Sequence, residues 1–213
     1  MSLPKTNTVI TIGRQFGSAG LAIGRQVAKD LGLKLYYKEI LDEITTEEDI
    51  CNSDARDITE DNSVNSFLYS IAMNKATIGT YADMPINQKQ FISQVETIKH
   101  IAKEGPCVLV GLCADYALAG NADVMSFFIH ANMDSRIRRI ARLYDVTDSK
   151  AKDMIIETDT KRNNYYNFYS NKKWGVAESY HMCLDSSVLG IDGTAEIIKQ
   201  LIRIKENGSE KKL

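Results

Sequence analysis

The sequence predicts an α/β fold in which helices cover a parallel sheet on both faces. Two continuous apolar runs, at 107–110 and 124–129, are typical of strands buried on both sides. Stretches with helical spacing separate these runs, and a third strand leads directly into a glycine-rich turn and a helix at 8–31. Strands that alternate with helices favour a doubly wound parallel sheet, because parallel strands need right-handed crossover connections.

Composition limits the class of protein and its partners. The chain has 213 residues, of which 44% are hydrophobic, so one domain can bury a full core. A net charge of −2 gives no general attraction for nucleic acid or an anionic membrane, and no apolar run is long enough to span a bilayer. The four cysteines form no CxxC pair, which indicates reduced thiols. We therefore expect a cytoplasmic protein that binds neither nucleic acid nor membrane; a homo-oligomer remains open.

The elements follow one another along the chain as strands, helices and one inserted segment. The expected strands cover 8–12, 34–37, 107–110, 124–129 and 180–184. The expected helices cover 19–31, 38–48, 87–103, 134–143, 148–158 and 194–205. The acidic and tyrosine-containing segment 44–86 is interpreted as an inserted helical lobe, whose acidity is most simply a solvated face. The single domain therefore carries a lobe near its first third.

A glycine-rich turn after the first strand is the first candidate site. Gly17, Ser18, Ala19 and Gly20 stand between a strand and a helix, where backbone N–H groups can face a phosphate. A tight turn with close helix packing is the alternative. The positions of the lysine and hydroxyl residue of a Walker A loop hold Leu21 and Ala22 instead.

Arginines supply the positive charge that this loop lacks. Arg14 is the nearest replacement for the missing lysine, with a surface arginine as the alternative. Further along, Arg138 and Arg142 share one helical face, while Arg136 and Arg139 form another pair. Such a density suits either a lid that clamps phosphates or a solvated helix with acidic neighbours.

Four segments together resemble the cytidylate kinase-like branch of the P-loop nucleoside monophosphate kinases. They are Ile12–Gly20, Gly105–Tyr116, Thr158–Gly175 and Cys183–Ile191. The resemblance covers nearly the whole chain. It implies a P-loop kinase fold with a five-stranded parallel sheet flanked by helices, an acceptor-binding lobe at 44–86 and a lid region at 134–175.

The resemblance also implies an activity and a set of site residues. The activity is ATP-dependent phosphoryl transfer to a nucleoside monophosphate, with Mg²⁺ bridging phosphates. The donor phosphates would be bound by the backbone of Gly17, Ser18, Ala19 and Gly20, with support from Arg14. The expected lid residues are Arg138, Arg142 and Arg162, with Asp159 orienting the lid, and the expected acceptor-side residues are Asp115, Tyr36 and Lys38.

Departures from the family pattern fall on the most substrate-specific positions. Leu112 stands where the family has an arginine, and Tyr37 stands where it has an aspartate, which a tyrosine cannot replace as a metal ligand. Two alternatives therefore stay open beside the kinase: a nucleotide-binding protein with weak or lost catalysis, and a kinase for another small acceptor. The sequence assigns neither the acceptor nor any metal ligand.

Overall fold

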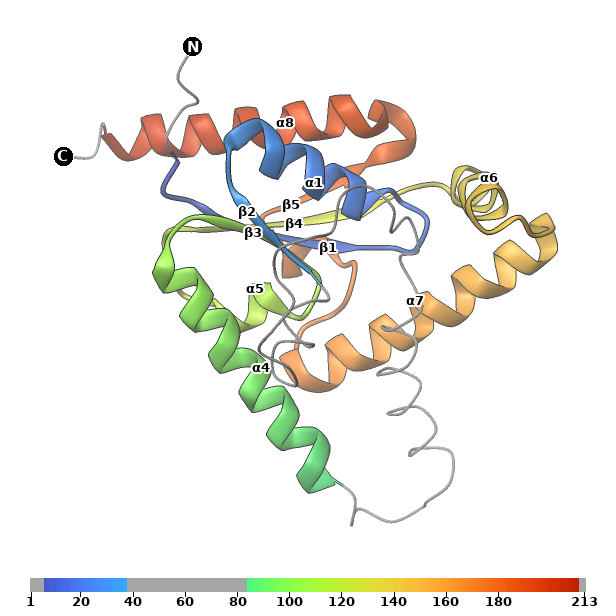
Figure 1. The fold of residues 1–213 in the computed structure, drawn as a ribbon, viewed down its shortest axis with the longest axis horizontal. Coiled ribbons are helices and arrows are strands. Elements are labelled where there is room, and N and C mark those ends of the chain that lie inside the picture. Colours follow the sequence, from blue (N-terminus) through green and yellow to red (C-terminus); the bar gives the residue numbers. More distant parts are fainter. Residues whose placement is uncertain (1–5, 38–83, 211–213) are drawn as a thin grey trace, which may run out of the picture.

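The protein is built around one parallel sheet. The structure, a computed structural model, describes residues 6–37 and 84–210 of the chain. Within these residues five strands pair in the order β2-β3-β1-β4-β5 (Figure 1). The strands are β1 (Val9–Arg14), β2 (Lys34–Tyr36), β3 (Cys107–Val110), β4 (Val124–His130) and β5 (Met182–Asp185). Because β1 lies in the middle, the loop after it reaches the centre of the carboxyl edge of the sheet.

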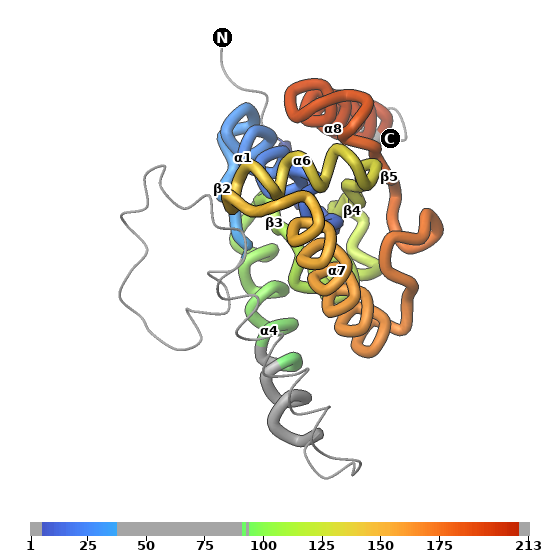
Figure 2. The backbone as a smooth tube through the Cα atoms, turned by 90° about the vertical axis from the view of Figure 1, so that its right-hand side faces the viewer, coloured from blue at the N-terminus to red at the C-terminus, as the bar shows by residue number. Residues whose placement is uncertain are grey.

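Helices lie on both faces of this sheet. One face is covered by α1 (Gly20–Leu31) and α8 (Ser186–Glu210) (Figure 1). The opposite side holds α4 (Met84–Glu104), α5 (Ala114–Ala117) and α7 (Asp148–Ser170). The short helix η2 (Ala177–Ser179) precedes β5, and α6 (Met133–Tyr144) leads from β4 into α7. The perpendicular view in Figure 2 again shows α1 and α8 together on one side and α7 on the other.

The core explains why the central strands are mostly apolar. Ile10 and Ile12 of β1 are almost fully buried under α1 and α8, while Val9 belongs to the opposite core with Leu109 of β3. Since the three central strands β1, β3 and β4 are largely buried on both faces, their sequences are mostly apolar instead of alternating. The predicted parallel sheet is thus confirmed.

Two helices differ from the sequence expectation. The segment predicted to end as a helix at 158 continues as α7 to Ser170, because its aromatic residues find partners on α4; the rings of Tyr169 and Phe91 stack with centroids 4.1 Å apart. The last helix begins at Ser186, eight residues before the expected start at 194, and is interrupted at Gly190 (φ 66°, ψ −174°). The extension of α7 comes from tertiary contacts, and the interruption of α8 falls at a glycine.

Part of the predicted organisation lies outside the described residues. This applies to the helix expected at 38–48 and to nearly all of the lobe expected at 44–86, whose last three residues belong to α4. No helix within residues 6–37 and 84–210 has the length and apolar character needed to cross a lipid bilayer.

Candidate functional site

The loop that connects β1 to α1, residues 13–20, is called the phosphate loop below. Gly17 (φ 77°) and Ala19 (φ 64°) both have left-handed backbone conformations. Ala19 is the N-cap of α1 and gives it no side-chain cap. Among the described residues, no hydrogen bond uses the N–H groups of Gly17, Ala19 or Gly20. Open N–H groups at the start of a twelve-residue helix form a site suited to an anion.

The phosphate loop is clamped from outside by α6 and α7. Asp159 of α7 accepts a hydrogen bond from the Phe16 N–H (2.7 Å) and forms an ion pair with Arg136 of α6. Arg136 also donates through Nη1 to the Phe16 carbonyl (3.1 Å). The side chains of Arg136 and Asp159 are 6% and 15% exposed, so this pair is well shielded from water. The role of Asp159 visible here is to fix the loop to the two helices.

Arg162, one turn further along α7, brings a second guanidinium beneath the same loop. Its Nη1 donates to the carbonyl of Arg14 (3.3 Å), and its Cζ lies 5.7 Å from the centre of the Phe16 ring. The residue is 8% exposed, and its Nε and Nη2 atoms have no hydrogen-bond partner in the described part of the chain. A buried cation with unsatisfied donors is costly unless an anion joins it.

Arg14 itself lies across the mouth of the loop. A Cβ built on Gly20 would meet the Arg14 Cβ at 2.5 Å, so the stem of the arginine runs directly over this glycine. A Cβ built on Gly111, just after β3, would lie 1.9 Å from Arg14 Nη1. The side chain is half-buried and therefore reaches solvent.

The remaining predicted lid arginines lie elsewhere. Arg138 and Arg142 are exposed on α6, and Arg138 donates to the hydroxyl of Ser135 (3.3 Å). The buried face of this helix carries Arg136 and Ile140 instead. The sequence pattern did not distinguish Arg136 from the other arginines of the basic cluster. Its position four residues before the apolar Ile140, on the same helical face, was the signal that indicated burial.

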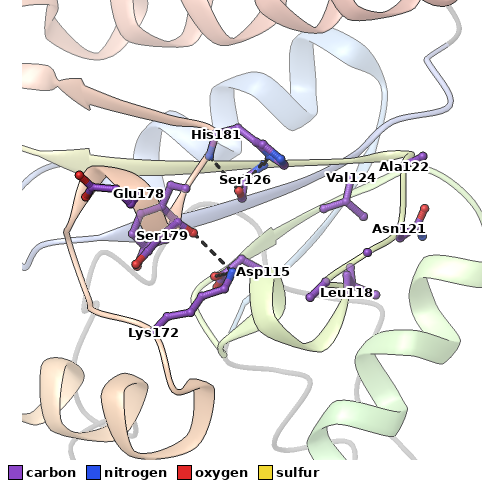
Figure 3. Close-up of a pocket in the computed structure, with 13 residues that line it drawn as sticks. Asp115, Leu118, Asn121, Ala122, Val124, Ser126, Lys172, Glu178, Ser179 and His181 are labelled. Carbon is purple, nitrogen blue, oxygen red and sulfur yellow. Dashed lines mark hydrogen bonds and ion pairs between the residues drawn. The ribbon is translucent and has the colours of Figure 1, made fainter.

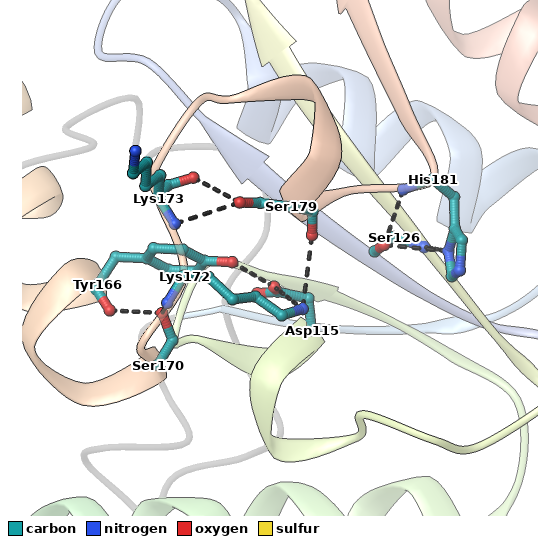
Figure 4. Close-up of polar contacts among 8 residues, drawn as sticks. All are labelled: Asp115, Ser126, Tyr166, Ser170, Lys172, Lys173, Ser179 and His181. Atoms are coloured by element: carbon teal, nitrogen blue, oxygen red, sulfur yellow. Dashed lines mark hydrogen bonds and ion pairs between the residues drawn. The ribbon is translucent and has the colours of Figure 1, made fainter.

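The predicted acceptor-side residues are not gathered at the phosphate loop. Lys38 lies outside the described residues. Tyr36 is half-buried at the end of β2 and packs against the core formed by β3, α4 and α5. Asp115, at the start of α5, is held in a network of its own: its Oδ2 accepts from the hydroxyl of Tyr166 (2.6 Å) and lies 3.4 Å from Lys172 Nζ (Figure 4).

This network borders a cavity of about 380 Å³, called the Asp115 groove (Figure 3). Its wall also includes Ser126 of β4 and His181, whose Nδ1 accepts from the Ser126 N–H (2.9 Å). Burial and the neighbouring Asp115 carboxylate raise the pKa of Tyr166, so its hydroxyl stays protonated and donates to Asp115. In the Asp115 groove, the Asp115 carboxylate and the Lys172 ammonium group therefore form an ion pair with each other.

Three of the departures from the family pattern have a visible structural setting. Leu21 is 6% exposed in the core between the sheet, α1 and α8, which is no place for a lysine ammonium. Leu112 lies in a left-handed turn with Gly111 and Cys113 (φ 63°, 82° and 54°). Tyr37 accepts a hydrogen bond from Arg25 Nη2 (3.2 Å).

The described residues do not provide a dedicated magnesium site. Within 6–37 and 84–210, no group of three histidine, cysteine, aspartate or glutamate side chains is placed to hold a metal ion. Both oxygens of Asp159 are engaged by Phe16 and Arg136, and the position of the Walker A hydroxyl is Ala22.

Comparison with known proteins agrees with this geometry. The sequence profile of the cytidylate kinase-like family matches residues 9–188. A crystal structure of an uncharacterized protein from Eubacterium ventriosum is similar at 25% identity with a TM-score of 0.70, covering 92% of this chain and 98% of that one. No match is found among curated protein sequences.

Two further solved structures share the fold at low sequence identity. One is a gluconokinase from Sinorhizobium meliloti, with 13% identity, a TM-score of 0.54 and coverage of 98% of this chain and 99% of that one. The other is a shikimate kinase from Bacteroides thetaiotaomicron, with 12% identity, a TM-score of 0.51 and coverage of 92% and 98%. The predicted P-loop kinase fold is confirmed.

Proposed function

This chain belongs to the cytidylate kinase-like family, and we propose that it transfers the γ-phosphoryl group of ATP to a nucleoside monophosphate, with a cytidine monophosphate as the expected acceptor. One observation carries the proposal. The Arg162 guanidinium is buried beneath the phosphate loop with two donor atoms unused among the described residues. Folding tolerates such a charge where a ligand anion completes it, and the triphosphate of ATP supplies that anion.

The residues around the loop divide the work of positioning. The N–H groups of Gly17, Ala19 and Gly20 and the start of α1 bind the donor phosphates in this proposal. Arg162 supplies charge from below the loop, while Arg136 and Asp159 hold the loop rigid. Since phosphoryl transfer depends mainly on positioning and electrostatic stabilisation, rigidity here contributes directly to rate.

The proposed phosphoryl transfer needs no general base from the protein. A phosphate oxygen of the acceptor forms a bond to the γ-phosphorus, the bond from that phosphorus to the bridging oxygen of ADP breaks, and ADP keeps the electron pair. The attacking oxygen is already largely deprotonated at neutral pH, because the second pKa of a phosphate monoester is about 6. Arg138 and Arg142, exposed on α6, join the phosphates in this scheme only when the predicted lid, 134–175, closes.

The test is a phosphoryl-transfer assay with ATP, Mg²⁺ and each of the common nucleoside monophosphates, followed by ³¹P NMR. We expect formation of ADP together with the matching nucleoside diphosphate, and loss of both in Arg162→Met. That variant, purified identically, also controls for contaminating kinases. ADP formation that no monophosphate increases above the background would contradict the proposal.

A nucleotide-binding protein without transfer activity is the second candidate. The observation that favours it is the burial of Leu21, since the loop has no lysine and the core has no room for its charge. Charged groups that stabilise phosphoryl transfer are worth roughly 10³–10⁵ in rate. Binding of an ATP analogue without any turnover would identify this second function.

A further inference from the structure

The Arg14 side chain runs from the phosphate loop to the turn that follows β3. Arg14 is the last residue of β1, and its stem passes over Gly20. From there the guanidinium continues to Gly111, where a Cβ would lie 1.9 Å from Nη1 and 3.1 Å from Cζ. The charged end of Arg14 therefore rests on the backbone that follows β3.

The order of the strands shows to which side of the sheet the Arg14 side chain points. In the sheet, β3 and β2 lie on one side of β1, while β4 and β5 lie on the other. The phosphate loop is fastened to the β4–β5 side, because the Ser186 hydroxyl at the start of α8 donates to the carbonyls of Ser18 (2.6 Å) and His130 (3.1 Å). Arg14 points to the other side, to Gly111 after β3; β3 pairs with β2, after which the acceptor lobe is predicted to begin.

The backbone against which Arg14 rests is firmly shaped. Gly111, Leu112 and Cys113 are all left-handed, a conformation that costs free energy at the two non-glycine residues. The Gln94 side chain fixes this turn by donating to the Leu112 carbonyl (2.6 Å). Leu112 contributes an apolar side chain that packs toward α4 and α5, so the charge at this turn comes from Arg14.

We propose that Arg14 binds the acceptor, through a phosphate or carboxylate group of that molecule, and leaves the donor phosphates to the loop and Arg162. This inference rests on the proposed function and revises the expectation that Arg14 supports the donor. A planar guanidinium can donate two parallel hydrogen bonds to such an oxyanion, which selects acceptors that carry one.

A pair of glycine substitutions tests the placement of Arg14 without changing the arginine. In Gly111→Ala, the new methyl group occupies the position of the guanidinium and displaces this flexible end. Gly120→Ala is the matched control: its φ of +81° is close to the +82° of Gly111, and nothing lies within 4 Å of its Cβ. Both alanines carry the same left-handed strain, on the order of 1–2 kcal/mol, but only one displaces Arg14.

The readout is calorimetric titration of protein saturated with a non-hydrolysable ATP analogue. We expect Gly111→Ala to raise the acceptor Kd at least about tenfold, the loss of one charge-assisted hydrogen bond, and to change the analogue Kd less than about twofold. Gly120→Ala should leave both values unchanged. Arg14→Met should reproduce the Gly111→Ala pattern, and Arg14→Lys should restore only part of the affinity.

The two possible sources of the oxyanion form two arms of this titration. One arm uses the nucleoside monophosphates and the other uses small hydroxycarboxylates; the arm whose affinity depends on Arg14 identifies the acceptor class. A higher analogue Kd with an unchanged acceptor Kd in Arg14→Met and Gly111→Ala would overturn the inference in favour of a donor role. An acceptor that binds through Arg14 but receives no phosphoryl group would instead contradict the proposed function alone.

Discussion

The phosphate loop and the Asp115 groove are both polar, yet their charges are balanced differently. At the loop, the buried guanidinium of Arg136 is paired with Asp159, whereas that of Arg162 keeps unused donors among the described residues. In the groove, Asp115 is matched by Lys172 and by the Tyr166 hydroxyl. An excess of buried cation indicates a place for an external anion, whereas a balanced network stabilises the fold by itself.

The largest effect is expected where the loop is clamped. Asp159→Asn leaves Arg136 buried without its counter-charge, so we expect the free energy of unfolding to fall by about 3–5 kcal/mol. Urea unfolding measures it. The control, Glu157→Gln, lies on the same helix with a side chain 64% exposed, and should stay within about 0.5 kcal/mol. A loss in Asp159→Asn as small as in this control would show that the clamp does not hold the loop.

In the Asp115 groove we expect a moderate loss of stability with no change in nucleotide binding. Tyr166→Phe removes a hydrogen bond to a carboxylate, which should lower the free energy of unfolding by about 1–3 kcal/mol and leave the Kd of an ATP analogue unchanged. Tyr116→Phe, which removes the hydroxyl of a ring 37% exposed, is the matched control.

The same groove also tests the predicted role of Asp115. Asp115→Asn should reduce stability without weakening acceptor binding if its charge only serves the network with Lys172 and Tyr166. A higher acceptor Kd in this variant would give the groove the substrate role predicted from the sequence, and would remove the contrast between the two regions.

The smallest effect concerns a surface pair that joins α1 to α8. Lys199 Nζ lies 2.6 Å from Asp30, and this contact lowers the pKa of Asp30 and raises the pKa of Lys199. Because the folded pKa of Asp30 is depressed, the pair stabilises above the unfolded value of about 4 and its contribution is lost as the pH falls further. The raised pKa of Lys199 means a corresponding loss at high pH, above about 10.4.

We therefore expect Lys199→Met to lower the free energy of unfolding by less than about 1 kcal/mol at pH 7, and by still less at pH 3. Urea unfolding at the two pH values measures this. Lys99→Met, which breaks the exposed pair with Glu96, should show no measurable change at either pH. A Lys199→Met loss that grows on acidification would contradict the assignment.

The sequence predicted the sheet and the phosphate loop because both depend on local signals. The run 107–110 is apolar because β3 is buried on both faces, and the glycines at 17 and 20 mark a turn into a helix. The predicted length of α7 was wrong, because its last turns depend on the packing of Tyr169 against Phe91, which lies far away in the sequence. The clamp by Arg136 was missed for the same reason: Asp159, its partner, lies 23 residues further on another helix.

The most direct measurement is a calorimetric titration of a non-hydrolysable ATP analogue into the wild-type protein and Arg162→Met, together with urea unfolding of both. The account predicts that the wild type binds and that Arg162→Met binds about 10–100-fold more weakly, as expected for one or two charge-assisted hydrogen bonds. Unfolding should show that the variant is no less stable than the wild type, because no carboxylate within residues 6–37 and 84–210 forms an ion pair with Arg162. Equal affinity in the two proteins, or a large loss of stability in the variant, would contradict the claim that this charge is kept for a ligand.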